Sequence, residues 1–133
     1  MKLTVHVDGG SRGNPGAAAA GVVVSDANGD VVDEATQLLG EQTNNVAEYR
    51  ALLLGVARAK ELGATEVEIV NDSELIAKQV NGQYKVKHAA MKPLHAQALR
   101  ELSSFDKWTV RTVRRDQNAD ADALVNQALD SAL

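Results

Sequence analysis

Residues 2–16 read KLTVHVDGGSRGNPG, and this stretch decides the fold. Leu3, Val5 and Val7 alternate with polar residues, a pattern typical of a strand with one buried face. The glycine-rich residues 9–16 close on Asn-Pro-Gly and predict a loop. Asp8 is therefore expected at the end of the strand, where the chain leaves the sheet.

Two further strands are expected next. Residues 17–25 are small or β-branched, and residues 31–39 form a returning run. Ala-Asn-Gly-Asp at 27–30 separates the two runs and is a strong hairpin signal. Because short connections join all three strands, we expect an antiparallel meander.

The rest of the chain alternates between helices and strands. Thr43, Asn44 and Asn45 offer an N-cap for a helix that Gly63 ends. A strand that follows a helix should run parallel to the first strand. The later elements are expected as a strand at 66–70, helices at 72–80 and 91–102, a strand at 107–113, and a last helix capped by Asn118 and running to Leu129.

The expected fold class is therefore α/β, with one domain over residues 1–133. Its mixed sheet has five strands flanked by helices. The first three strands should be antiparallel, with strands four and five parallel to strand one.

Composition excludes several classes of protein. The chain has no cysteine, which rules out disulfides, zinc–thiolate sites and thiol catalysis. The N-terminus reads as a strand rather than a signal sequence, and no apolar run approaches the roughly 20 residues that span a bilayer. We therefore expect a cytoplasmic protein with no membrane partner.

The net charge of −4 hides a strong asymmetry. Residues 78–115 hold nine basic and two acidic side chains, a net charge of +7 that leaves −11 for the rest. A basic region beside an acidic one suits an enzyme that grips a phosphate backbone and holds metals elsewhere. A solvated helix face beside an unrelated acidic surface explains the charges more simply.

Four acidic residues lie at predicted element ends. Asp8 and Asp72 end neighbouring strands, and Glu48 and Asp122 are expected in the first turns of helices, where the dipole favours an anion. Singly, each has an ordinary role as a strand end, an N-cap or a helix-start residue. Together, four carboxylates in one crevice would repel each other unless cations lay among them. The set therefore predicts a divalent-metal site and phosphate chemistry.

The motifs around these residues follow a fixed order over nearly the whole chain: Asp8-Gly-Gly-Ser-Arg-Gly-Asn-Pro-Gly, Thr43-Asn-Asn-Val-Ala-Glu48-Tyr, Asp72-Ser, and Arg115-x-x-Asn118-x-x-Ala-Asp122-x-Leu. In combination they resemble type 1 ribonuclease H, and within it the compact subgroup of archaea and actinobacteria. The resemblance implies an RNase H-like fold and hydrolysis of the RNA strand of RNA/DNA hybrids.

The resemblance also implies a metal arrangement. Two Mg²⁺ ions would lie about 4 Å apart, with Mn²⁺ as an alternative metal, and the products would carry 5′-phosphate and 3′-hydroxyl ends. Asp8 would bridge both ions. Asp122 would hold the ion on the side of the attacking water, and Glu48 and Asp72 would hold the other.

A second group of residues is expected to contact the hybrid. Glycine allows the backbone to approach a ligand closely, and in the family the neighbouring asparagines contact the minor groove. For several of these residues an ordinary role is open as well, such as N-capping at Thr43 or a solvated side chain at Arg12. The expected substrate contacts are Gly9, Gly10, Ser11, Arg12, Asn14, Thr43, Asn44, Asn45, Glu74 and Arg115.

The chain departs from the family pattern at three points. Arg115 stands where many bacterial enzymes have a loop histidine. Glu74 replaces a usual glutamine, and a carboxylate cannot donate a hydrogen bond to a base edge. The basic handle of longer bacterial enzymes is missing, and we expect steep salt dependence as a result. Basic residues near Tyr84 would partly take its place: Lys85, Lys87 and Lys92.

Two other functions stay open. One is a non-catalytic module of the same fold that binds hybrids or double-stranded RNA, although a pure binder gains nothing from four carboxylates facing phosphates. The other is a different metal-dependent phosphotransferase, although no P-loop or phosphoaspartate motif is present. The expected partner is an RNA/DNA hybrid, with double-stranded RNA as a further candidate and no obligate protein partner. His88 and His95 are expected on the solvated surface.

Overall fold

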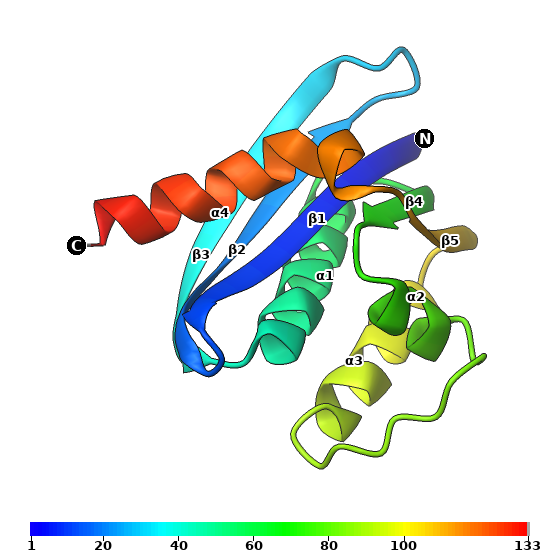
Figure 1. The fold of residues 1–133 in the computed structure, drawn as a ribbon. Helices are drawn as coiled ribbons and strands as arrows, with labels where there is room; N and C mark the ends of the chain where they lie inside the picture. The colour runs from blue at the N-terminus through cyan, green and yellow to red at the C-terminus, as the bar shows by residue number, and fades with distance from the viewer. Residues whose placement is uncertain (133) are drawn as a thin grey trace.

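The computed structural model describes residues 1–132 and shows a five-stranded sheet with helices on both faces (Figure 1). The elements, in chain order, are β1 (Lys2–Gly13), β2 (Gly16–Ser25), β3 (Val31–Gln42), α1 (Asn44–Glu61), β4 (Glu66–Asn71), α2 (Glu74–Val80), α3 (Lys92–Leu102), β5 (Lys107–Thr112), a 3₁₀ turn (Arg115–Asn118) and α4 (Ala119–Ser131).

The strands lie in the order β3-β2-β1-β4-β5. β2 pairs antiparallel with β1 and β3, whereas β4 pairs parallel with β1 and β5, which confirms the predicted topology. The β1–β4 register places His6 opposite Val70. Because the two strands run parallel, Asp8 and Asp72 lie at the same end of the sheet.

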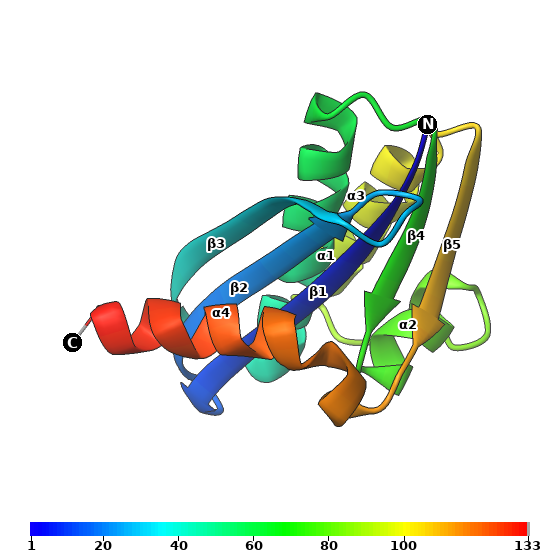
Figure 2. The ribbon, with the colours of Figure 1, turned by 90° about the horizontal axis from the view of Figure 1, so that it is seen from above.

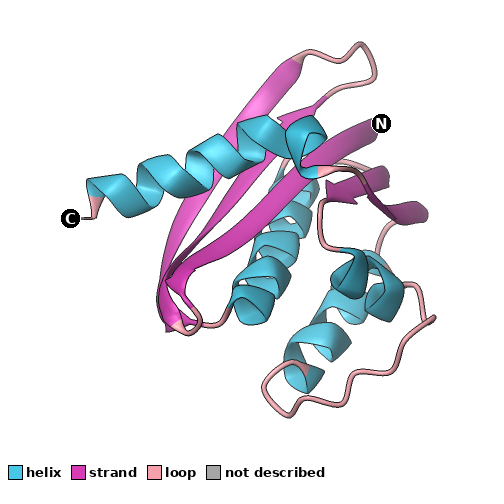
Figure 3. Ribbon diagram, viewed as in Figure 1, coloured by secondary structure: helices cyan, strands magenta, loops and turns pink. Residues whose placement is uncertain are grey.

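Two apolar layers enclose the sheet. The larger core lies between the sheet and the helices α1 and α3, and the smaller one lies under α4, where Ala19 packs against Val125 and Leu129. Figures 2 and 3 show α4 crossing one face while α1 and α3 cover the other. No helix within residues 1–132 is both long and apolar enough to span a membrane; the cytoplasmic location stays a prediction.

The predicted glycine loop at residues 9–16 is wrong. β1 continues to Gly13 and pairs with β2 up to the Gly13–Gly16 pair, leaving only a tight hairpin. Alternation of side chains cannot reveal this extension, because glycine has no side chain to alternate while its backbone groups still pair. The third strand is likewise longer than predicted and ends at Gln42.

Two helix starts also differ from the prediction. α2 begins at Glu74 rather than Asp72, because Ser73 caps it by accepting a hydrogen bond from the Ile76 amide at 3.3 Å. Asn118 precedes α4, but its side chain makes no cap hydrogen bond there. Its amide instead donates to the Val7 carbonyl at 2.9 Å, which ties the start of α4 to β1 beside Asp8.

Candidate metal centre and its cleft

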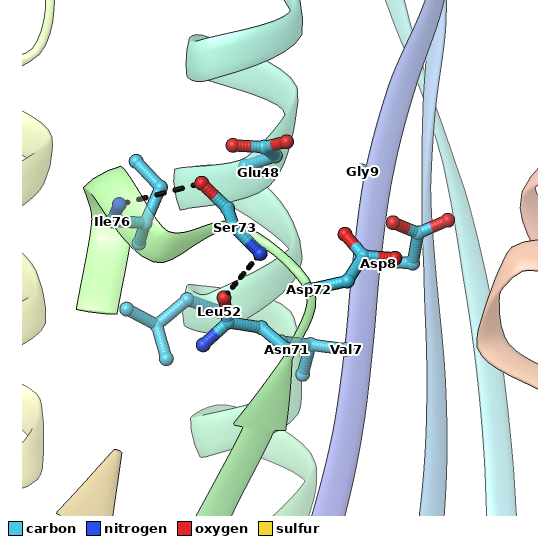
Figure 4. Close-up of a pocket in the computed structure, with 9 residues that line it drawn as sticks. All are labelled: Val7, Asp8, Gly9, Glu48, Leu52, Asn71, Asp72, Ser73 and Ile76. Carbon is cyan, nitrogen blue, oxygen red and sulfur yellow. Dashed lines mark hydrogen bonds between the residues drawn. The ribbon is translucent and has the colours of Figure 1, made fainter. Parts of the chain in front are cut away.

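The four predicted carboxylates line one cleft although they come from four elements. Asp8 lies on β1, Glu48 on α1, Asp72 directly after β4, and Asp122 in the first turn of α4. Figure 4 shows Asp8 and Asp72 side by side, with Glu48 on the adjacent helix. Glu48 does not lie in the first turn of α1, as predicted, but in the second, so the helix dipole favours its charge less.

Close backbone packing brings α1 to this position. A Cβ atom at Gly9 would lie 2.1 Å from the Ala47 carbonyl oxygen, a distance that no side chain could accommodate. Glycine at this position therefore lets the helix rest on β1. Since Glu48 follows Ala47, the same contact sets Glu48 beside Asp8.

The site concentrates negative charge in a partly apolar setting. Val7, Leu52 and Ile76 line the pocket between Asp8 and Glu48 (Figure 4). Burial, followed by the charges of Asp72, Asp122 and Glu48, raises the pKa of Asp8 to about 8, and a hydrogen bond shared with Asp122 adds to the shift.

Glu48 experiences a similar environment. Burial raises its pKa to about 6, and the charge of Asp72 adds to this rise. The Ser73 side chain and the Arg115 guanidinium partly oppose the rise. Both shifts indicate carboxylates that a bound cation would stabilise in the ionised form.

Two carboxylate oxygens without hydrogen-bond partners also indicate that a cation would stabilise the site. Glu48 Oε2 and Asp72 Oδ2 are buried without a hydrogen-bond partner, an expensive condition for anionic oxygens. An all-carboxylate donor set suits hard divalent cations such as Mg²⁺ or Mn²⁺. As the side chains stand, no three histidine, aspartate or glutamate residues of 1–132 form a ready metal cluster. The residues therefore fit a metal in chemistry, while the coordination shell would have to close around it.

Several predicted substrate residues share the cleft with the carboxylates. The backbone of Gly9, Gly10 and Ser11 forms one wall, and Asn44 and Arg115 complete it. The Asn44 side chain makes two hydrogen bonds to Ser11. Its Oδ1 accepts a hydrogen bond from the Ser11 amide at 2.9 Å and another from the Ser11 hydroxyl at 3.0 Å. These bonds fix the extended end of β1 to the start of α1.

The other predicted substrate residues have structural partners. Asn14 Oδ1 accepts from the Asn44 amide at 3.1 Å, and Thr43 caps α1 by accepting from the Val46 amide. Asn45 is the second residue of that helix and half-buried.

Two charged residues of the predicted set are held in ion pairs. Arg12 lines the cleft but pairs with Asp130 on α4 at 2.6 Å. Glu74 is exposed at the start of α2 and pairs with Lys78 at 2.7 Å. Their assignment as substrate contacts stays a prediction.

Sequence reasoning missed two supporting residues. Asn126 lies one helical turn after Asp122, and its amide donates to Asp122 Oδ2 at 3.4 Å. That spacing of four residues is a signal that the sequence does contain. His95 was expected on the solvated surface, but it is half-buried and bonds to the backbone of α2, a contact that no local pattern announces.

Known proteins resemble this chain over nearly its whole length. The model of the "Reverse transcriptase-like" family matches residues 6–128. The chain is 45% identical over 133 residues to the "Bifunctional protein Rv2228c" of Mycobacterium tuberculosis, covering 99% of this chain but 36% of that protein. The chain thus spans about a third of the length of this relative.

Two solved structures are closely similar. The crystal structure of RNase H1 from Halobacterium salinarum superimposes with a TM-score of 0.96 at 37% identity, covering 98% of this chain and 99% of the other. LC11-RNase H1, solved in complex with an RNA/DNA hybrid, superimposes with a TM-score of 0.93 at 39% identity, covering 98% of both chains.

Proposed function

The chain belongs to the ribonuclease H family, and from this premise we propose that it is an endoribonuclease that hydrolyses the RNA strand of RNA/DNA hybrids. One observation carries the proposal: Asp8, Glu48, Asp72 and Asp122 line a single open cleft. A module that only binds nucleic acid would gain nothing from this charge, because carboxylates repel phosphates.

The same carboxylates would hold two divalent cations. When bound, such ions lower the pKa of water and neutralise charge that develops on the phosphate, and the products would be 5′-phosphate and 3′-hydroxyl ends. The carboxylates come from a strand, the end of a second strand and two helices, and these elements fix where the ligand oxygens lie. The apolar floor of Val7, Leu52 and Ile76 limits the water that reaches these oxygens from behind.

Residues around the carboxylates would bind the duplex. The backbone at Gly9 and Gly10 allows close approach, and Asn44 faces the same cleft. Arg115 lies near enough to Glu48 to lower its pKa, so its guanidinium can meet a phosphate beside the metal ligands. The hybrid bound by LC11-RNase H1 supports this substrate class.

The proposal is tested by a cleavage assay on three substrates of one sequence: an RNA/DNA hybrid, double-stranded RNA and single-stranded RNA. Each is incubated with Mg²⁺, with Mn²⁺, and with a chelator. We expect cleavage of the hybrid that requires a metal and is lost in Asp8→Asn. Binding of the hybrid without cleavage by the wild-type protein in either metal would instead identify a binding module.

A further inference from the structure

A polar network joins three helices behind the metal centre. The hydroxyl of Tyr49 on α1 donates to Gln79 Oε1 on α2 at 2.6 Å. Nε2 of His95 on α3 donates to the Gln79 carbonyl at 3.0 Å. The rings of Tyr49 and His95 meet edge to face, with centroids 6.4 Å apart and planes at 84°. Gln79 is thus held from two sides.

Two of the three residues in the network are buried, whereas His95 is half-buried and lines a surface groove. Tyr49 is 0% exposed and Gln79 is 5% exposed. A buried hydroxyl or amide that loses its partner keeps its full desolvation cost, so these groups favour one arrangement over any shifted alternative. The network therefore specifies where α2 sits relative to α1.

The position of α2 in turn affects the distance between two of the proposed metal ligands. Tyr49 directly follows Glu48, while α2 begins two residues after Asp72. Ser73, which caps α2, lines the same pocket as Glu48 and Asp72 (Figure 4). α2 has only seven residues, and beyond the network Asn81 fixes its far end by donating to the Val110 carbonyl at 2.9 Å. A shift of this short helix would therefore move Asp72 relative to Glu48.

We infer that Tyr49, Gln79 and His95 are positioning residues that keep Asp72 within reach of Glu48, so that the two carboxylates can close around a shared divalent cation. None of the three lines the cleft that contains all four carboxylates. The inference rests on the proposed metal-dependent function. It extends that function by assigning the geometry of the metal ligands to a network that acts through α2.

The test measures metal binding directly. Mn²⁺ is titrated into the protein without nucleic acid, and the free ion is followed by electron paramagnetic resonance. We expect Tyr49→Phe and His95→Ala to weaken Mn²⁺ binding by about tenfold or more, the size of effect seen when groups that support metal ligands are removed. The kcat on the hybrid should fall in parallel, with KM changed less than twofold. His95→Gln, whose amide can donate to the same carbonyl, should restore most of the affinity.

A matched control separates positioning from general stability. Val67→Ala removes core packing at the far end of β4, the strand that leads to Asp72, without touching the network. At equal loss of Tm, this variant should keep wild-type Mn²⁺ affinity. If Tyr49→Phe does no more than Val67→Ala, the network is merely structural. A wild type that binds Mn²⁺ but leaves hybrids intact would refute the proposed function, while the comparison of Mn²⁺ affinities would still decide the inference.

Discussion

Asp8 is the clearest case of a site residue whose surroundings lower the stability of the folded protein. It sits half-buried on the central strand and faces the charges of Asp72, Asp122 and Glu48. Its pKa rises from an ordinary 3.8 to about 8, so the folded protein without metal retains a proton that the unfolded chain releases. Stability should therefore fall as the pH rises from about 4 toward 8.

Asp8→Asn should accordingly separate stability from activity. The amide has no proton to take up when the chain folds, so we expect roughly 1 kcal/mol of added stability at pH 7 in a chelating buffer, with a flatter dependence on pH. Cleavage of the hybrid should fall on the order of 10³-fold. Urea unfolding and a cleavage assay measure the two effects.

Asp120→Asn is the matched control for this prediction. Asp120 lies two residues before Asp122, in the same turn of α4, but it is exposed and does not line the cleft. Asp120→Asn should leave the free energy of unfolding unchanged and should change the cleavage rate by less than about twofold. Equal effects from the two variants would mean that net charge, rather than the cluster, controls both properties.

At the scale of elements, α4 depends on a close backbone contact with the sheet. A Cβ atom at Gly21 on β2 would lie 2.6 Å from the Ala121 carbonyl oxygen. Because Ala121 precedes Asp122, this contact sets the depth at which Asp122 enters the cleft.

Gly21→Ala should therefore push α4 outward, at a cost of about 1–3 kcal/mol in stability. Activity should fall more than stability explains, because Asp122 moves with the helix. Ala123→Gly serves as control, since it weakens the same helix at an exposed position by about 1 kcal/mol without changing its contact with β2. Urea unfolding measures the loss of stability in each variant, and kcat is measured well below the Tm. Equal kcat values for Gly21→Ala and Ala123→Gly would contradict the prediction.

A second contact between elements links β3 to α1. The Arg58 guanidinium donates to both carboxylate oxygens of Asp33, at 2.7 and 2.9 Å. These hydrogen bonds lower the pKa of Asp33 below its ordinary 3.8. The stabilising effect of the ionised carboxylate is therefore present above pH 3.8 and is lost as the pH falls through the lower folded value.

Asp33→Asn should lower the Tm by a few degrees at pH 7. The difference from wild type should shrink as the pH falls below 3.8 and through the lower folded pKa, because the wild-type carboxylate then takes up a proton. Thermal unfolding followed by circular dichroism over a series of pH values measures this. Glu34→Gln, at the exposed neighbouring position, should show no such dependence; a deficit for Asp33→Asn that stays constant down to pH 2 would exclude the mechanism.

At the scale of the whole molecule, charge is divided between two regions. The acidic cleft contrasts with the basic segment 78–115, part of which forms a surface groove between the loop after α2 and α3. Lys85 and Lys92 line this groove together with Tyr84. A hybrid that enters the cleft would be long enough to reach charged groups outside it.

Lys85→Gln with Lys92→Gln should weaken hybrid binding in a salt-dependent manner. If each lysine contacts one phosphate, the slope of log K against log salt should fall by about two, with kcat unchanged. The control is Lys2→Gln with Lys107→Gln, which removes the same charge from lysines that pair with Glu66 on the sheet. Fluorescence anisotropy from 50 to 300 mM salt measures the slopes; equal slopes for both double variants would leave the groove without a role in binding.

The sequence predicted most of the fold because its signals are local. Alternation marked the first strand, Ala-Asn-Gly-Asp marked a hairpin, and Thr43 marked the start of α1. The errors occurred where local signals are silent: at the glycines that continue β1, and at Asn118, whose amide bonds to a residue 111 positions away.

The same division holds for the site. The sequence by itself determined which carboxylates are present and placed Asp72 and Asp122 at element ends, since residue type and period are local properties. It placed Asp8 and Glu48 too close to element ends, because β1 continues past Asp8 and Glu48 lies in the second turn of α1. Only the tertiary structure decided that Asp8, Glu48, Asp72 and Asp122 share a cleft, and that Tyr49, Gln79 and His95 support it from behind. Contacts between distant segments depend on how closely helices approach the sheet, and that depends on packing at Gly9 and Gly21 rather than on any pattern along the chain.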